Sequence, residues 1–281
     1  TITRGAGRLG EVRVMRNKLT MIGLRPFRQS DAHALEAGYP TTMEVAGNIL
    51  KRTYGAGLFL FGGKRSGAGG EVALARYLVH HNKAEQTLLS TNDWGGIETW
   101  QGGPFYVYNN ISANPNGYWN WAANKPHNAR LGYALYHDGG HKNYDFNNIL
   151  WGLNNEADSK HCHPAAINEA TPTTHNKYVN NTIYRFSKGN DWSPSGGHHQ
   201  FLGNIWSDIS QTVFLHGRLK EDTAAAHGEE YPHGLMAYGE NVFYDIGPVF
   251  GVFEVSGKGY GDFAAFQGAL RRRSALDTDL G

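Results

Sequence analysis

Three carboxylates in this 281-residue chain have a spacing that would permit acid–base chemistry: Glu98, Asp138 and Glu169. Glu98 and Glu169 each stand twelve residues before a recurring asparagine, and Asp138 stands ten residues before another. Both offsets are even, so on extended strands the three side chains would share one face. A protonated carboxyl beside an ionised one supplies the acid and the base or nucleophile of glycoside hydrolysis. We therefore expect Glu98, Asp138 and Glu169 to line one catalytic groove.

The separation of these carboxylates leaves the stereochemical outcome open. Strands stacked at roughly 4.8 Å would place carboxylates on adjacent strands near the roughly 5 Å gap of a retaining glycosidase. Alternate strands would place them about 9–10 Å apart, near the upper end of the inverting range. The twelve-residue offset also predicts a column of acids and rings along the same face, and its other members are Glu36, Gly70, Tyr136, Trp192 and Glu229.

Rings and histidines near this column predict carbohydrate binding, because aromatic faces pack on sugar rings and polar groups fix hydroxyls. The expected substrate-binding residues are Trp94, Trp100, Tyr136, His137, Trp192 and His233. The alternative is that many of these rings fill the core and that the histidines are structural. The sequence has neither an HExxH motif nor a pair of CxxC motifs, so no metal ligands are predicted.

A repeated asparagine string identifies the elements that would carry these residues. Asparagine followed by an aliphatic pattern recurs at intervals of 34, 28, 38, 33, 23 and 37 residues, with β-rich runs beside it. The repeats begin at Asn48, Asn82, Asn110, Asn148, Asn181, Asn204 and Asn241. A period in this range, with up to three short strands in each repeat, predicts an all-β solenoid that winds as a right-handed parallel β-helix. The unequal intervals disfavour the equal blades of a propeller.

The repeat also predicts a corner and a core. Asparagine tolerates the left-handed conformation of a sharp turn, and stacked side-chain amides can bond from one repeat to the next. The aliphatic residues that follow are expected to point inward and stack, and they are Ile111, Ile149, Ile183, Ile205 and Val242. Thr182 reads as an extra residue before Ile183 and predicts a local bulge.

Composition excludes several classes of partner. A formal net charge of +1 gives no sign of nucleic-acid or anionic-membrane binding, and no apolar run approaches the length of a membrane span. Cys162 is the sole cysteine, so the redox compartment is not readable and no intrachain disulfide can form. We expect a parallel β-helix domain over 1–261 and a helical or capping segment over 262–281. The chain starts at Thr1 with neither Met nor a signal peptide, which suggests a fragment or a processed chain.

Three strings resemble the pectate-lyase-like superfamily of right-handed parallel β-helix carbohydrate-active enzymes. They are 108–112, 146–150 and 180–184, and the stretch 93–103 looks like segments of bacterial glycoside hydrolases in that group. The resemblance covers about residues 11 to 256. It implies the fold and a carbohydrate substrate, while the superfamily itself includes hydrolases, lyases, epimerases and phage tailspikes.

The leading hypothesis is a glycoside hydrolase acting on a poly- or oligosaccharide without a cofactor, in a secreted or periplasmic location. The runner-up is a calcium-dependent polysaccharide lyase. That branch of the superfamily uses a Lys or Arg base, which the predicted column lacks, although Arg130, Lys142 and Arg185 are near in sequence. The third hypothesis is a non-catalytic carbohydrate-binding β-helix, like an adhesin or a tailspike shaft. The sequence gives no oligomeric state.

Overall fold

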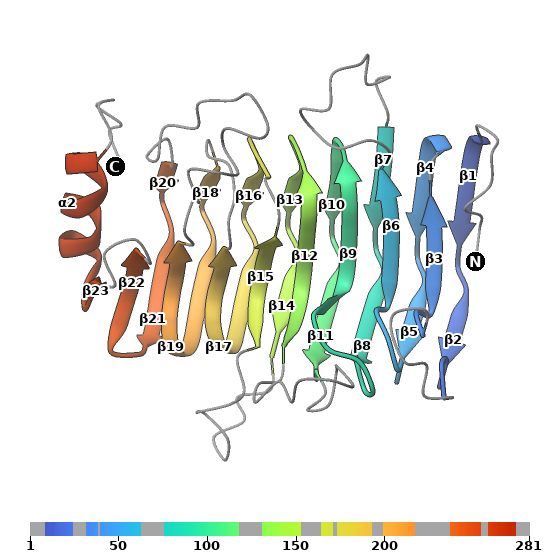
Figure 1. Ribbon diagram of the computed structural model, residues 1–281, viewed down its shortest axis with the longest axis horizontal. Helices are drawn as coiled ribbons and strands as arrows, with labels where there is room; N and C mark the ends of the chain where they lie inside the picture. The colour runs from blue at the N-terminus through green and yellow to red at the C-terminus, as the bar shows by residue number, and fades with distance from the viewer. Residues whose placement is uncertain are drawn as a thin grey trace, which may run out of the picture.

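The chain is built almost entirely of β-strands that run side by side in parallel sheets (Figure 1). This computed structural model describes residues 9–24, 32–38, 40–62, 76–117, 131–152, 164–170, 173–192, 199–216, 237–253 and 258–273. The predicted all-β class is therefore confirmed. No helix in these ranges has the length and apolar character needed to cross a membrane.

An eight-stranded sheet, here called the small sheet, is parallel throughout. Its strands, in spatial order, are β1 (Leu9–Met15), β4 (Pro40–Ala46), β7 (Arg76–His80), β10 (Phe105–Tyr108), β13 (Tyr144–Phe146), β16 (Lys177–Val179), β18 (Gln200–Leu202) and β20 (Ala237–Gly239).

A fifteen-stranded sheet has two arms joined by its two longest strands, β17 (Thr182–Trp192) and β19 (Ile205–His216). The rest of the first arm is β2 (Lys18–Thr20), β5 (Ile49–Lys51), β8 (Lys83–Thr87), β11 (Ile111–Pro115), β14 (Ile149–Trp151) and β21 (Val242–Ile246). The rest of the second arm is β3 (Leu35–Gly38), β6 (Leu58–Gly62), β9 (Trp94–Gly102), β12 (Gly132–Gly140), β15 (Ala165–Ala170) and β22 (Val249–Phe253). The short β23 (Lys258–Tyr260) pairs antiparallel with β22.

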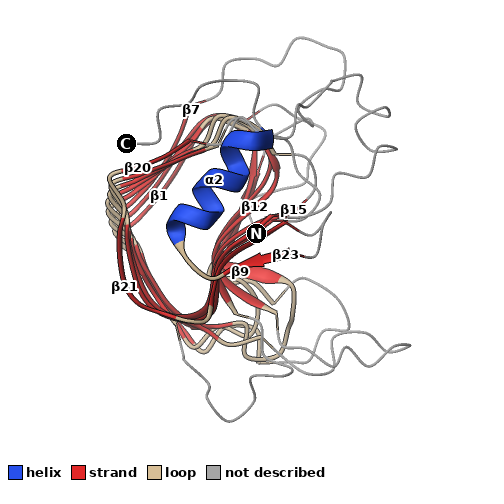
Figure 2. Cartoon of the chain, turned by 90° about the vertical axis from the view of Figure 1, so that its left-hand side faces the viewer, coloured by secondary structure: helices blue, strands red, loops and turns tan. Residues whose placement is uncertain are grey.

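Up to β15, each pass of the chain lays one strand on the small sheet, one on the first arm and one on the second. Each strand from β1 to β14 therefore pairs with the strand three places later in sequence, and β15 pairs with the long β17. Viewed along the long axis, the sheets surround one core, and α2 (Phe263–Arg273) lies across the C-terminal end of it (Figure 2). Asp262 accepts the amide of Ala265 at 2.7 Å and caps this helix, whose Phe266 is fully buried. A helix over this stretch was expected from the sequence.

The recurring asparagines form one continuous ladder between the small sheet and the first arm. The Nδ2 of Asn110 donates to Oδ1 of Asn148 at 3.1 Å, and the backbone amide of Asn110 donates to the same oxygen at 3.0 Å. The second Nδ2 proton satisfies a strand carbonyl, that of Val79 at 2.8 Å. The same contacts recur from Asn17 to Asn241, so the predicted amide stacking is confirmed.

The residues with a left-handed backbone conformation at this turn come one position before the ladder asparagines and are not members of the ladder. Asn109, Asn147 and Asn180 have φ values of 53°, 56° and 52°. Asparagine tolerates this conformation better than other residues that carry a Cβ, which explains the doubled asparagines. The first of each pair makes the turn, and the second makes the ladder.

The predicted inward aliphatic residues are wrong by one position in all but one repeat. Ile149, Ile205 and Val242 point outward and are 44%, 43% and 56% exposed, and Ile111 is partly exposed. The buried residue is the next one, such as Leu150, because side chains alternate across a strand. Ile183 is buried because Thr182 takes the outward place opposite Ile149, so no bulge lies there. The register shift in β17 falls instead between Phe186 and Lys188.

Candidate functional site

Two of the three predicted carboxylates lie on the outer face of the second arm, on neighbouring strands. Glu98 of β9 stands opposite Tyr136 of β12, and Asp138 of β12 stands opposite Trp100 of β9. Residues two apart on a strand share a face, so all four belong to one surface. The spacing argument therefore placed Glu98 and Asp138 correctly with respect to each other.

Asp93, which sequence reasoning did not select, joins this pair. It precedes β9 with a φ of 62°, and its amide donates to the carbonyl of Leu131 at 2.9 Å. Its carboxyl is half-buried, and burial together with the charges of Asp138 and Asp191 raises its pKa to about 6. In the sequence, the feature that could have pointed to Asp93 is its position just before Trp94 and the glycine pair 95–96.

Glu98 is buried behind these groups, with 1% of its surface exposed. Its Oε2 accepts the amide of Gly95 at 2.9 Å. A Cβ on Gly95 would lie 2.9 Å from the Cβ of Tyr136, so glycine lets β9 approach β12 and fold back onto the carboxyl. Burial raises the Glu98 pKa well above its ordinary value, the Gly95 amide opposes this, and nearby Asp138 and Asp93 add to it.

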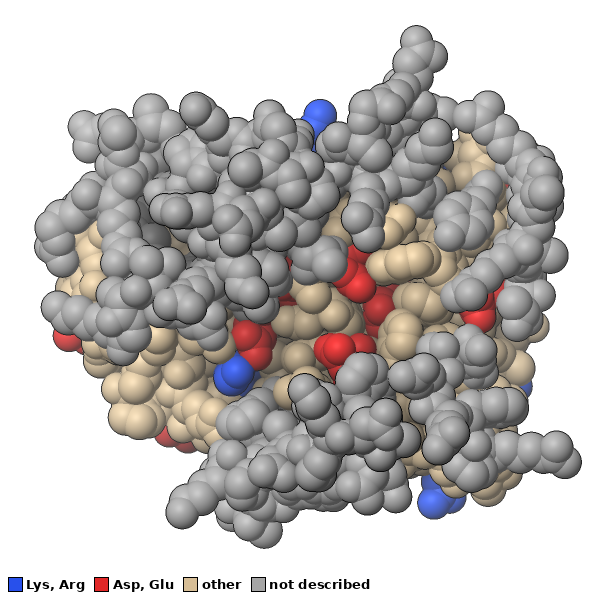
Figure 3. Space-filling model, viewed as in Figure 1, with Lys and Arg blue, Asp and Glu red and all other residues tan. Residues whose placement is uncertain are grey.

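A fourth carboxylate extends the group along the sheet. Asp191 of β17 pairs in register with Asn168, which pairs with Tyr136, so it lies in the same column as Glu98. Its Oδ2 accepts Lys188 Nζ at 2.6 Å. Asp93, Glu98, Asp138 and Asp191 are here called the acid cluster. Acidic side chains gather near the middle of this face in the space-filling view (Figure 3).

Aromatic rings line the N-terminal side of the acid cluster. Trp94 meets Phe59 edge-on at 4.9 Å between ring centroids, and Trp100 meets Phe61 at 5.1 Å. Trp94 and Trp100 are each partly exposed, while the phenylalanines beneath them are buried. Tyr136 is nearly buried and packs on Tyr133, and its hydroxyl hydrogen-bonds to Asp93. Trp94, Trp100 and Tyr136, three of the residues predicted to bind substrate, therefore lie beside the acid cluster.

Glu169 and His137, both predicted for the groove, instead point into the core. Glu169 pairs with His137 in register, one residue away from the column that carries Glu98. The twelve-residue count failed because Asn168, which occupies the column, is thirteen residues before Asn181, so this repeat has one residue more between the column and its asparagine. Glu169 is fully buried and accepts from Tyr178 Oη at 2.6 Å and from Asn176 Nδ2 at 2.8 Å.

His137 belongs to an interior hydrogen-bond chain beneath the acid cluster. Its Nδ1 lies 2.6 Å from Thr99 Oγ1, and its Nε2 lies 2.9 Å from Asp145 Oδ2. Burial opposes the charge of His137, but Asp145 and Glu169 outweigh burial and raise its pKa. For Asp145, burial raises the pKa, and the attraction of His137 offsets only part of this rise. These hydrogen bonds join β9, β12 and β13. They therefore help to fix the register of the strands that carry Glu98 and Asp138.

The remaining predicted residues are not placed in the site. Trp192 ends β17 with its backbone opposite Glu169, and His233 lies outside the described residues. Within the described ranges, no three His, Cys, Asp or Glu side chains are grouped so that they would hold a metal ion.

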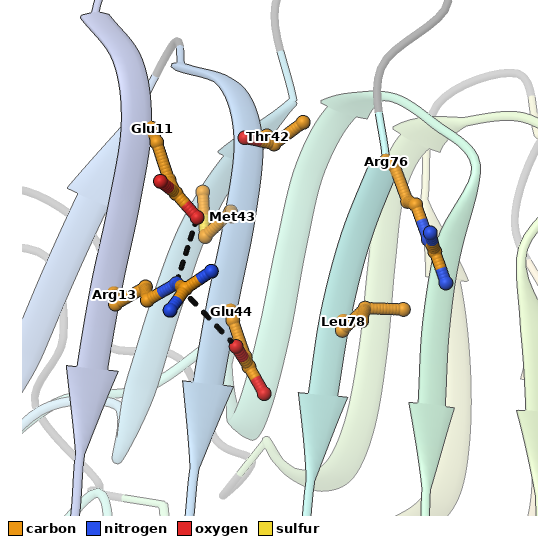
Figure 4. Close-up of a pocket in the computed structure, with 7 residues that line it drawn as sticks. All are labelled: Glu11, Arg13, Thr42, Met43, Glu44, Arg76 and Leu78. Carbon is orange, nitrogen blue, oxygen red and sulfur yellow. Dashed lines mark hydrogen bonds and ion pairs between the residues drawn. The ribbon is translucent and has the colours of Figure 1, made fainter.

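A shallow pocket lies elsewhere, on the outer face of β1, β4 and β7 near the N-terminal end (Figure 4). Its Arg13 Nε is 2.7 Å from Glu11 Oε1 and 3.7 Å from Glu44 Oε2, so its main charges pair with each other. The pocket is on the small sheet, away from the acid cluster, and includes none of the predicted residues.

Comparison with protein-family models, with curated protein sequences and with solved structures finds no match to this chain.

Proposed function

We infer that the chain winds as a right-handed parallel β-helix. Support comes from the three-strand pass, in which every strand pairs parallel with its counterpart in the next pass. Connections between parallel strands of one sheet are nearly always right-handed.

We propose that this protein is a glycoside hydrolase that acts on a poly- or oligosaccharide, in a secreted or periplasmic location. The observation that carries the proposal is the pairing of Asp93, whose pKa is about 6, with Asp138 on one face beside Trp94 and Trp100. A carboxyl that stays protonated up to about pH 6 next to an ionised one suits acid-catalysed departure of a sugar leaving group.

The roles follow from exposure. Asp93 is half-buried and protonated below about pH 6, so we assign it the general acid. Asp138 is partly exposed and is assigned the base or nucleophile. Glu98 is too buried to touch a sugar, and burial with the charges of Asp138 and Asp93 raises its pKa, so we assign it a place as a protonated carboxyl beneath the two aspartates. The rings of Trp94 and Trp100 would hold flanking sugars.

The acid cluster favours hydrolysis over elimination. A calcium-dependent lyase neutralises the uronate carboxylate with a calcium ion held by carboxylates, and within the described residues no three such side chains are grouped to hold one. The described cation beside the cluster, Lys188, is already bonded to Asp191. A calcium-dependent lyase is therefore the weaker proposal.

The test is release of reducing ends from a panel of neutral polysaccharides, followed by product analysis. Asp93→Asn and Asp138→Asn should each lower turnover by a factor of about 100 or more without lowering the melting temperature. Glu85→Gln, on the outer face of the first arm, is the matched control and should retain full activity. Full activity in both Asp variants, or products with a new double bond, would reject the proposal. Binding of a polysaccharide without cleavage would favour a non-catalytic binding protein.

A further inference from the structure

One polar side chain at the acid cluster has no hydrogen-bond partner among the described residues. Asn168 of β15 pairs in register with Tyr136 on one side and with Asp191 on the other. It therefore belongs to the column that contains Glu98, and its side chain faces outward with the cluster. The side chain is nearly buried, with 4% of its surface exposed. Within the described ranges, no hydrogen bond joins its amide to another group.

The neighbours of Asn168 direct their polar groups elsewhere. The Tyr136 hydroxyl hydrogen-bonds to Asp93. Asp191 Oδ2 accepts from Lys188 Nζ at 2.6 Å. Neither adjacent strand therefore gives Asn168 a partner. A nearly buried polar group without a partner lowers the stability of the folded chain, so this amide calls for an explanation outside the fold.

The surface beside Asn168 is accessible next to Asp138. Ala170, two residues further along β15, lies opposite Asp138 and is partly exposed. On the other side of Asp138, the position in register is occupied by Trp100. The Cα atoms of Asn168 and Asp138 lie diagonally across neighbouring strands, about 8 Å apart. One sugar ring placed over Ala170 would therefore contact both side chains.

The chemistry of the amide selects the group that it would bind. An asparagine side chain presents N–H donors and a carbonyl acceptor side by side in one plane. Two neighbouring hydroxyls of a sugar accept from the donor and donate to the acceptor. The ammonium group of an amino sugar would use the carbonyl alone and leave the N–H donors unpaired. A pair of hydroxyls therefore satisfies the amide more completely than a cation does.

We propose that Asn168 binds two neighbouring hydroxyls of the sugar unit that lies over Ala170, beside Asp138. This inference deepens the proposed function and rests on the acid cluster being a sugar site. The substrate is then a neutral saccharide whose units have two adjacent free hydroxyls. Asn168 contributes affinity and selectivity and takes no part in proton transfer. Its amide, unpartnered in the free protein, gains its hydrogen bonds when the sugar binds.

The experiment measures kcat and KM on cellohexaose, xylohexaose and mannohexaose, whose internal units have two neighbouring free hydroxyls. Asn168→Leu keeps the branched shape of the side chain and removes its polar atoms. It should raise KM about tenfold, the loss of one or two hydrogen bonds, with kcat little changed. Its melting temperature should equal or exceed that of the parent, because the folded chain loses an unpartnered amide. Ser207→Ala, on the outer face of the first arm, is the control and should leave KM unaltered.

Calorimetric titration in an Asp93→Asn background measures binding apart from cleavage. Asn168→Leu should weaken binding of the same saccharides by the same factor. Laminarihexaose, whose internal units lack adjacent free hydroxyls, should bind more weakly and should bind both forms alike. An equal loss of laminarihexaose binding in Asn168→Leu would overturn the hydroxyl-pair assignment.

The outcomes separate this inference from the hydrolase proposal. Cleavage by the parent with KM and affinity unchanged in Asn168→Leu overturns the inference and leaves the hydrolase proposal standing. A lower melting temperature with unchanged affinity would likewise make Asn168 a structural residue. Binding that depends on Asn168, without cleavage by the parent, supports the inference and rejects hydrolysis. No binding of any of the three saccharides overturns the inference.

Discussion

At the scale of single residues, proximity of like charges sets the chemistry of the acid cluster. Asp93 is close enough to Asp138 and Asp191 for both to raise its pKa, and its own charge acts on Glu98. Four carboxyls this near each other cannot all be ionised at neutral pH without a large cost. The cluster therefore holds protons that isolated carboxyls would have released.

The pKa of Asp93 tests this coupling without any substrate. Asp138→Asn removes one of the charges that raise it, so the Asp93 pKa should fall from about 6 toward its ordinary value. Carbon-13 NMR titration of the aspartate carboxyls would measure the shift. Glu85→Gln, which lies on the other arm, should leave the Asp93 titration unchanged. An Asp93 pKa that is the same with and without Asp138 would show that the two groups are not coupled.

At the scale of the strand, one position separates a core residue from a surface residue. Leu150→Ala should cost about 2–5 kcal/mol of unfolding free energy, because Leu150 is fully buried. Ile149→Ala, at the adjacent exposed position, should change stability by less than about 0.5 kcal/mol. Urea denaturation of the two variants measures both values. Equal losses would contradict the observed register of β14.

The asparagine ladder makes a second prediction at this scale. Asn148 accepts from Asn110 and donates to Asn181 and to the carbonyl of Val107. Asn148→Ala leaves several buried polar groups without partners, so it should destabilise by about 3 kcal/mol or more. Asn17 is at the exposed end of the ladder, and Asn17→Ala should cost clearly less. Chemical denaturation compares the two, and similar losses would mean that the ladder contributes little.

The strands show how far sequence reasoning reaches. Asparagine spacing predicted the ladder because a side-chain amide stack leaves a direct mark in the sequence. It placed Ile149 rather than Leu150 in the core, which is wrong. Both residues are aliphatic, and alternation along a strand assigns faces only after the orientation of one residue is known. The column count placed Glu98 beside Asp138 but misplaced Glu169, because loop lengths differ between repeats. Asp93 was missed because its neighbours across the sheet come from β12 and β17, distant in sequence.

At the scale of the whole molecule, buried protons link stability to pH. The pKa values of Asp93, Glu98, Asp145 and His137 are all raised in the folded chain, so the folded state holds more protons than the unfolded state. Stability should therefore fall as pH rises from 5 to 8. Asp93 alone should account for about 1–2 kcal/mol of that loss.

Urea unfolding at pH 5, 6, 7 and 8 checks this dependence. Asp93→Asn should reduce the slope of stability against pH, because it removes one of the groups that gain a proton on folding. Lys51→Gln, a surface change on the first arm, should leave the slope unaltered. Stability that rises between pH 5 and pH 8 in the parent would contradict the assigned directions of these pKa values.

The asparagine ladder also gives the molecule an electrical direction. In each of its seven amide-to-amide bonds, the Nδ2 of one asparagine donates to the Oδ1 of the next asparagine toward the C-terminus. The side-chain dipoles therefore point the same way and add along the long axis, as peptide dipoles add along an α-helix. Sheets ordinarily have little net dipole, so this row gives a β-structure a negative pole at its N-terminal end and a positive pole at its C-terminal end.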